Sequence, residues 1–518
     1  MASLASRLLL FRRGSAVSRP RTEHALAWYG HLLGALAFSL PFLGLSLWAQ
    51  GELFLSQHHA RLVTRVLVAL DRNRPEWIIS SYPPISFLLA LLKPSALTLS
   101  LAGGLLAGVM AWVLWNDLSQ GPLGFTVRLA LLASLVMTPA WAFLATQSFS
   151  YMISSFLFFL AWRSLRDWLI YGRTWAGFVA GMCLGLAFYA SLYALAFGLL
   201  WALVTPWAAS ATESTSPKEC REALLAKTLV IAFPVLMALI SWAYLNWVAS
   251  GDPWLFLRDP LSGTLAYLNR DAPPMIGLVA ALRGTGHELL RLPLYWAVGL
   301  IVALRARRWL PLYLVPLVSA TFLRALGFYF SEALLLIICT VMALGTLCRW
   351  SSRRWGIFLV LVALLQVALG IALPARDQEL VHWRDFLREG RPFATDEVER
   401  EVATRLRQAT PHSILTDDRY AYRLIARAGT ARPFVLPGDA TFELAMSDPG
   451  RRVKYILLSV EEGSSPSALS GIPLDEFALE ATWPDWQFYR SKAAPPLFNP
   501  AVSTSVVSGA KVWGSFGE

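Results

Sequence analysis

Long apolar runs recur along the chain up to about residue 374, and they constrain the fold more strongly than any other feature. The first run, residues 25–48, reads ALAWYGHLLGALAFSLPFLGLSLW. A helix of this length crosses a hydrocarbon core of about 30 Å, because each helical residue adds about 1.5 Å. Hydrophobic residues make up 56% of the chain and charged residues only 15%, which excludes an ordinary soluble protein. The sequence predicts an α-helical polytopic membrane protein.

The number of spans follows from the remaining runs. They lie near residues 94–115, 128–146, 149–165, 225–248, 288–304, 309–326, 328–347 and 356–373. The stretch 174–207 is too long for one span, and we interpret it as two short helices. Together the runs predict about eleven transmembrane helices, and an odd number places the two termini on opposite sides of the membrane.

Clusters of arginine and lysine predict the orientation, because short cytoplasmic segments are enriched in these residues. Four clusters flank the runs, within residues 163–173, 218–227, 305–308 and 349–354. With these inside, residues 1–24 form a cytoplasmic tail, and the membrane domain covers residues 25–374. The polar loops 51–84 and 249–287 then lie outside, in a multi-pass protein of the cell or inner membrane. The arginines and lysines that flank the membrane spans account for the net charge of +11. We therefore expect no nucleic-acid partner.

The segment 375–518 changes to charged and alternating sequence. It contains a helical pattern near residues 394–408 and three strand-like stretches, which are SILTDD (413–418), FVLPG (434–438) and VKYILLSV (453–460). Strands that alternate with helices are typical of a partly parallel sheet. The sequence therefore predicts a C-terminal extracytoplasmic α/β domain.

No motif in the sequence indicates nucleotide hydrolysis, dinucleotide chemistry or a zinc site. The sequence has no GxxxxGK[ST] and no GxGxxG that opens a helix after a strand, and its four cysteines lack the close paired spacing of a zinc site. The energy of any reaction must therefore come with its substrate. A divalent metal cation as cofactor stays open.

The loop 51–84 carries most of the candidate site residues. Its sequence is GELFLSQHHARLVTRVLVALDRNRPEWIISSYPP, and the candidates are Glu52 and Asp71 as catalytic acids and His58, His59, Arg61 and Tyr82 as substrate-binding residues. Each has a structural alternative. An acid just past a span is often only a helix end, Asp71 suits a turn, and the histidines suit a solvated helix face.

Two more candidates, Arg324 and Glu332, lie near the expected outer ends of two spans in the run TFLRALGFYFSEALLL. A charge near bilayer depth is costly and therefore favours function. We expect Arg324 to receive a lipid phosphate and Glu332 to orient it. The alternative is that the two side chains only pair with each other.

The start of the loop resembles the C-type (GT-C) integral-membrane glycosyltransferases, which use polyprenyl-phosphate-linked sugars. Several of them carry a motif like DDAFISYRYAR after a span. The stretch here, GELFLSQHHAR (51–61), keeps Phe54, Ser56, Ala60 and Arg61, with Glu52 as its acid and Gly51 in place of the other acid. Tyr82-Pro83-Pro84, and Asn246-Trp247 followed by Gly251-Asp252-Pro253, are also similar to this family.

The resemblance implies transfer of a sugar from a polyprenyl-phosphate donor to a glycan, lipid or protein acceptor, on the extracytoplasmic face and in contact with membrane lipids. Glu52 would be the base, and arginines or a metal would stabilise the departing phosphate. The alternatives are a transporter or flippase of lipid-linked glycans, a glycan polymerase or ligase, and a catalytically silent scaffold, given Gly51. The absence of an internal sequence repeat disfavours a transporter.

Overall fold

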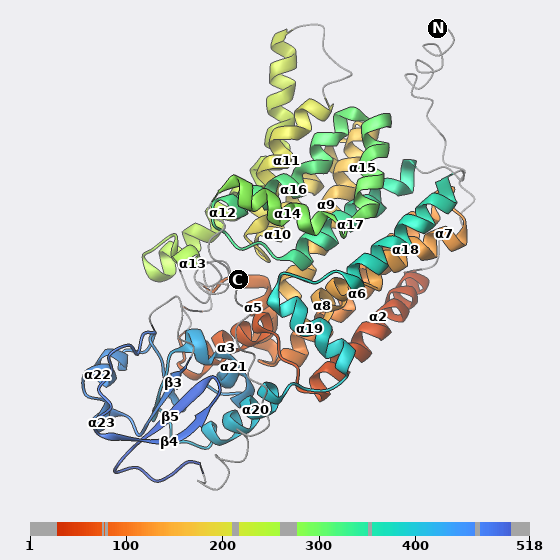
Figure 1. The fold of residues 1–518 in the computed structure, drawn as a ribbon. Coiled ribbons are helices and arrows are strands. Elements are labelled where there is room, and N and C mark those ends of the chain that lie inside the picture. Colours follow the sequence, from red (N-terminus) through yellow and green to blue (C-terminus); the bar gives the residue numbers. More distant parts are fainter. Residues whose placement is uncertain are drawn as a thin grey trace, which may run out of the picture.

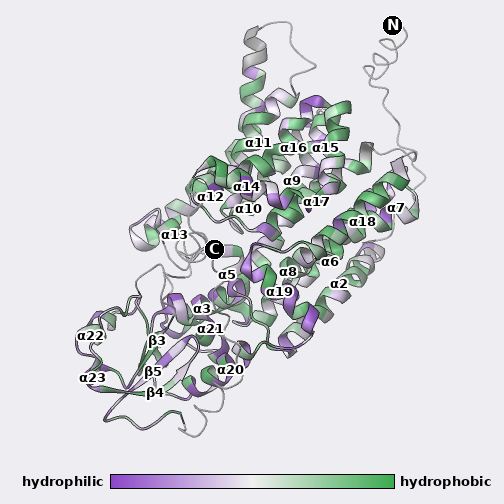
Figure 2. Ribbon diagram, viewed as in Figure 1, coloured by the Kyte–Doolittle hydropathy of each residue, from purple (hydrophilic) through white to green (hydrophobic). Residues whose placement is uncertain are grey.

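The computed structural model describes residues 28–74, 77, 81–209, 217–258, 277–350, 355–460 and 467–498. These residues form an apolar helical region and a smaller α/β region beside one end of it (Figure 1). Hydrophobic residues dominate the helices of the first region, and hydrophilic residues gather in the second (Figure 2). The expected tail 1–24 and residues 259–276 of the second outer loop lie outside the described residues.

The helices of the apolar region follow the predicted runs. Three contain stretches long and apolar enough to cross a membrane: α2 (Trp28–Gly51), α6 (Ala96–Ser119) and α12 (Pro217–Ser250). Two bent pairs could add one span each: α7 (Phe125–Val136) with α8 (Pro139–Gln147), bent by 61°, and α14 (Leu278–Leu289) with α15 (Pro293–Arg305), bent by 101°. By length and composition, the described part of the chain thus has three to five spans, and the number of about eleven stays a prediction.

Further helices complete the apolar region: α9 (Phe149–Tyr171), α10 (Thr174–Phe188), α11 (Tyr193–Ala209), α16 (Leu310–Ala325), α17 (Glu332–Trp350) and α18 (Gly356–Ala372). The break between α10 and α11 confirms the prediction of two helices within residues 174–207. Small residues let the helices approach closely. A Cβ atom at Gly181 or Gly185 would lie 2.9 or 2.8 Å from a backbone oxygen of α12.

The described residues of the loop 51–84 include helix α3 (Gln57–Asp71), and helix α5 (Pro84–Leu92) begins at the end of the loop. Ser56 caps α3, since its side chain accepts a hydrogen bond from the His59 N–H. The helix is strongly amphipathic. Leu62, Val63, Val66 and Leu67 are buried in one core with residues of the α/β region, among them Leu424 and Phe488.

The α/β region confirms the predicted partly parallel sheet. Helix α19 (Gln378–Glu389) precedes this region and packs in the core of the apolar helices through Leu380, Trp383 and Phe386. The elements of the α/β region are α20 (Ala394–Leu406), β1 (Ile414–Leu415), α21 (Asp418–Ala428), β2 (Phe434–Val435), α22 (Phe442–Ser447), α23 (Pro449–Arg452), β3 (Tyr455–Ser459), β4 (Phe477–Trp483) and β5 (Trp486–Ser491). The strand order is β2-β1-β3-β5-β4. Strand β1 is parallel to β2 and β3, while β5 is antiparallel to β3 and β4. The β4–β5 hairpin was not predicted.

Candidate functional site

Glu52 lies in the tight turn that joins α2 to α3. Helix α2 ends here because Leu53 adopts a left-handed backbone conformation, with φ of 62°, and the Phe54 N–H donates back to the Ala49 carbonyl over 2.9 Å. The Phe54 ring is buried against Trp383 and Phe386 of α19, with ring centroids 5.0 and 4.8 Å apart. The Glu52 side chain is half-buried and makes no hydrogen bond or ion pair with another described residue. Its carboxylate is therefore available to a ligand.

Asp71, the second candidate acid, lies at the other end of α3, and its carboxylate accepts hydrogen bonds from the α/β region. One carboxylate oxygen accepts hydrogen bonds from the Thr430 hydroxyl over 2.8 Å and the Ala431 N–H over 2.6 Å. The other accepts from Arg432 Nε over 3.2 Å. The next residue, Arg72, pairs with both oxygens of Asp439, at 2.6 and 2.7 Å. Asp71 thus helps to attach α3 to the α/β region.

Of the two histidines of α3, His59 is buried and His58 is half-buried, and both imidazoles are neutral. The Phe149 N–H donates to Nε2 of His59 over 3.2 Å, and the Nδ1 atom lies 3.4 Å from the Ser100 hydroxyl. His58 packs edge-on against the Tyr151 ring, with centroids 4.9 Å apart. Burial lowers the pKa of each imidazole to about 3, because desolvation disfavours the charged form. His58 therefore faces the interior of the molecule, and His59 joins three helices, α3, α6 and α9.

Arg61 and Tyr82 make structural contacts. The Arg61 guanidinium lies over the Tyr422 ring of α21, 4.8 Å from its centroid. The Tyr82 hydroxyl donates to the Phe188 carbonyl, and its buried ring packs 5.7 Å from that of Phe256. Arg61 thus joins α3 to the α/β region, and Tyr82 joins the end of the loop to α10.

Arg324 and Glu332 do not pair with each other, which corrects that alternative. The Arg324 guanidinium binds both oxygens of Glu288, at 2.9 and 2.6 Å, and the Phe330 carbonyl at 2.9 Å. Glu332 pairs with Arg291 and accepts the Arg376 N–H over 2.8 Å. Glu288, and not Glu332, orients the Arg324 side chain. The partners lie 36 and 41 residues away along the chain, so no local pattern in the sequence could identify them.

A group of tyrosines lies between His58 and Arg324, and no pattern in the sequence indicated it. The rings of Tyr151 and Tyr193 have centroids 6.0 Å apart, and the Tyr193 hydroxyl donates to the Tyr329 carbonyl. The Tyr329 hydroxyl in turn donates to the Asp377 carboxylate. Burial raises the pKa of Asp377. These side chains connect the first loop to the segment that enters α19.

Glu379, on the first turn of α19, is a further buried acid that the sequence analysis missed. Its Oε1 atom accepts the Gln57 N–H over 2.8 Å, and its Oε2 atom has no hydrogen-bond partner among the residues described. Burial raises the pKa of this carboxyl to about 7. An acid three residues past Arg376, just after the last apolar run, is the only signal in the sequence that could have indicated it.

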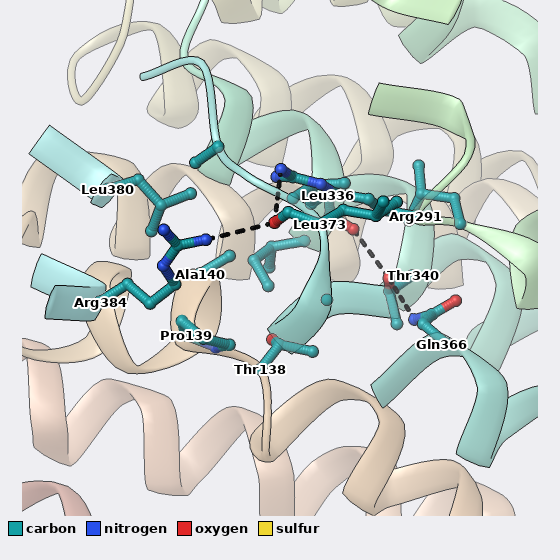
Figure 3. A pocket seen from close by; sticks show the side chains of 14 residues that line it. Thr138, Pro139, Ala140, Arg291, Leu336, Thr340, Gln366, Leu373, Leu380 and Arg384 are labelled. Carbon is teal, nitrogen blue, oxygen red and sulfur yellow. Dashed lines mark hydrogen bonds between the residues drawn. The ribbon is translucent and has the colours of Figure 1, made fainter. Parts of the chain in front are cut away.

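Two cavities differ in what they can hold. The first, of about 30 Å³, lies where α8, α17, α18 and α19 meet the segment between α14 and α15, and Arg291 and Arg384 both donate to the Leu373 carbonyl at its wall (Figure 3). It has room for water but not for a sugar. The second is an open hollow of about 630 Å³ beside the α2–α3 turn. It is lined by Leu53, Glu397, Arg400, Glu401, Thr404, Arg405 and Gln408.

Metal ligands are not grouped in the described part of the chain. No set of three or more histidine, cysteine, aspartate or glutamate side chains there is placed to hold a metal ion. Cys183, Cys339 and Cys348 are buried and form no disulfide with one another.

Comparison with solved structures identifies the fold. The crystal structure of ArnT from Cupriavidus metallidurans bound to undecaprenyl phosphate has a similar fold, with a TM-score of 0.56 and 14% sequence identity. The likeness covers 90% of this chain and 99% of that chain. No protein-family model and no curated protein sequence matches the chain. The likeness therefore concerns the fold.

Proposed function

We propose that this chain, an integral membrane protein with the GT-C fold seen in ArnT, transfers a sugar from a polyprenyl-phosphate donor to an acceptor on the extracytoplasmic face. The observation that carries the proposal is the similarity over 90% of the chain to a protein whose crystal structure holds undecaprenyl phosphate. A likeness of fold alone does not fix chemistry. The geometry of the α2–α3 turn supplies the second support.

Glu52 is the proposed general base. It follows the first apolar helix directly, and its carboxylate has no partner among the residues described. We expect a membrane lipid to present its phosphate at this end of the helix. In the proposed step the carboxylate takes the proton of the acceptor hydroxyl, and the oxygen bonds to the anomeric carbon of the sugar. The bond from that carbon to the phosphate oxygen breaks, and polyprenyl phosphate leaves with the electron pair. We favour Glu52 over Asp71, whose oxygens both accept hydrogen bonds.

Cationic side chains would stabilise the leaving phosphate. Arg324 is the proposed phosphate ligand, because its planar guanidinium can grip two phosphate oxygens. Its present partner, Glu288, would have to yield one or both of its hydrogen bonds to the donor. Glu332, His58, His59, Arg61 and Tyr82 are proposed to shape this side of the site. The described residues offer no metal cluster, and we assign no step to a metal.

The open hollow beside the α2–α3 turn is the proposed approach of the acceptor. Its volume of about 630 Å³ and its hydroxyl, amide and charged lining suit a polyhydroxylated molecule. Leu53, at its edge, is the neighbour of Glu52. An acceptor hydroxyl that enters from the hollow would thus meet the proposed base at the membrane surface.

Mass analysis of lipid-linked sugars and envelope glycans tests the proposal, in cells with the protein, without it, and with Glu52→Gln in its place. We expect one polyprenyl-phosphate sugar to accumulate, and one glycan modification to disappear, in both the deletion and the Glu52→Gln cells. If the lipid-linked sugar accumulates only on the cytoplasmic face, the protein is a flippase. If neither the lipid nor the glycan pool changes, the proposed function is wrong.

A further inference from the structure

We propose that Arg427, on helix α21 of the α/β region, is a positioning residue for Glu52. It acts by holding the strained α2–α3 turn from the side opposite the membrane helices. The proposal rests on the proposed function, since it presumes that Glu52 is the base. It assigns to the α/β region a role in the geometry of the reaction.

The turn that carries Glu52 contains a backbone conformation that its sequence does not favour. Leu53 has a φ of 62°, in the left-handed region that glycine adopts freely and that a leucine side chain makes costly. Glycine is the usual residue at this position past a helix end. Something outside the turn must therefore maintain the conformation.

Arg427 is that outside contact. Its Nη1 atom donates to the Leu53 carbonyl over 2.9 Å, although the two residues are 374 positions apart. The rest of the guanidinium is fixed, because Nε binds Glu399 Oε2 at 2.9 Å and Nη2 binds Asp396 Oδ1 at 2.5 Å. The Arg427 side chain is only 8% exposed and Asp396 is fully buried. Charge-assisted bonds to the fully buried Asp396 and to Glu399, which is 12% exposed, give this contact a rigid support.

The position of the Glu52 carboxylate depends on the backbone of this turn. No described side chain touches the Glu52 carboxylate by hydrogen bond or ion pair, so its direction is set by the backbone that bears it. Phe54 fixes one end of the turn in the aromatic pocket of Trp383 and Phe386. Arg427 fixes the carbonyl between Glu52 and Phe54. Catalytic groups need to be held within about 0.5 Å of their productive position, and these two contacts can provide that.

The test compares Arg427→Gln with a matched control, Arg72→Gln. Arg72 is about as buried, at 7% exposure, and like Arg427 it binds carboxylate oxygens and a backbone carbonyl: it pairs with both oxygens of Asp439 and donates to the Phe434 carbonyl. It lies at the far end of α3 from Glu52. Both variants should weaken attachment of the α/β region to a similar extent. Only Arg427→Gln should alter the turn.

Three measurements are made on each variant. Hydrogen exchange of the purified full chain should rise over residues 49–56 in Arg427→Gln and stay at the parent level there in Arg72→Gln. Sugar transfer at matched membrane abundance should fall by about ten- to a hundredfold in Arg427→Gln, as small displacements of catalytic groups do. Binding of undecaprenyl phosphate should stay unchanged in both, because Arg427 affects the base and not the donor.

A rescue variant separates positioning from general stability. Leu53→Gly removes the conformational cost of the turn, so the double variant Arg427→Gln/Leu53→Gly should recover at least about a third of the transfer that Arg427→Gln loses. Leu53→Gly should not restore the stability that Arg427→Gln loses elsewhere in the α/β region.

Three results would overturn the proposal: exchange over residues 49–56 that is equal in the two arginine variants, transfer that falls equally in both, or no rescue by Leu53→Gly. A failure of the proposed function gives a different pattern. If Glu52→Gln transfers at the parent rate while exchange over residues 49–56 still rises in Arg427→Gln, Arg427 holds the turn but the turn carries no base.

Discussion

The two candidate acids of the first loop differ in what their carboxylates contact, and the difference predicts opposite phenotypes. Glu52→Gln keeps the size of a side chain without described partners, so stability should change by less than about 0.5 kcal/mol. Transfer should fall by about a hundred- to ten-thousandfold, the usual effect of losing a general base. Undecaprenyl phosphate binding and thermal stability of the purified variant, measured beside transfer in cells, check this expectation.

Asp71→Asn is the comparison. The amide cannot accept all three hydrogen bonds from Thr430, Ala431 and Arg432, so the free energy of unfolding should fall by about 1–3 kcal/mol. Transfer per folded molecule should fall much less than in Glu52→Gln. If Asp71→Asn abolishes transfer while the protein stays folded, and Glu52→Gln does not, the roles are reversed.

Arg324→Lys tests the proposed phosphate ligand. Lysine keeps the charge but cannot bind both oxygens of Glu288 and the Phe330 carbonyl at once. We expect weaker binding of undecaprenyl phosphate and slower transfer. The control is Glu288→Gln, which frees the guanidinium of its anionic partner and should preserve or tighten binding. Equal loss of stability in both variants with unchanged binding would make Arg324 a structural residue.

The raised pKa of Glu379 predicts that the stability of the protein depends on pH. Its pKa is about 7 in the folded protein, against an ordinary value of 4.5. An acid with a raised pKa binds more protons when folded, so stability falls as the pH rises from about 4.5 through 7. Glu379→Gln keeps the acceptor for the Gln57 N–H and should remove a loss of up to about 3 kcal/mol. Thermal unfolding of detergent-solubilised protein at pH 5 and pH 8 measures this effect. Glu397→Gln, at an exposed position of α20, should leave the slope unchanged.

Helix α3 is built into the core of the α/β region although it lies more than three hundred residues earlier in the chain. Val66 is fully buried in that core, while Leu70 on the same helix is 47% exposed. Val66→Asp should destabilise the α/β region by more than about 3 kcal/mol, because it buries an unpaired charge. Leu70→Asp should change stability little. Protease cleavage within residues 375–498 of membrane-embedded protein compares the two, and equal cleavage would mean that α3 does not support this region.

The elements of the fold could be predicted from the sequence to the extent that they depend on local patterns. Apolar length located the helices, and the alternation of strand and helix signals predicted the partly parallel sheet. The contacts that build the candidate site join distant positions: Leu53 with Arg427, Glu332 with Arg291, and Gln57 with Glu379. Nothing local distinguishes the correct partner among 45 lysines and arginines and 34 acids. The position of Glu52 after the first span was predictable, but the contacts that hold its turn were not.

At the scale of the whole molecule, the length and direction of the helices predict which parts share a side of the membrane. The first residue of α6, Ala96, packs beside Leu55 and Tyr422, so this end of α6 lies at the α/β region. The helix has 24 residues, so its other end, Ser119, lies about 36 Å away at 1.5 Å per residue. That distance exceeds a hydrocarbon core of about 30 Å. Ser119 and the exposed Ser447 of α22 should therefore be on opposite sides.

The arginine clusters decide which side is which, and single cysteines test the result. They favour Ser119 in the cytoplasm and Ser447 outside. In a Cys220→Ser background, Ser447→Cys should react with a membrane-impermeant maleimide in intact cells, and Ser119→Cys should react only after the membrane is opened. The other three cysteines are buried and should stay silent. The reverse pattern would put the α/β region and Glu52 in the cytoplasm, where a donor presented on the outer face could not reach them. Labelling of both sites from one side would contradict the span assigned to α6.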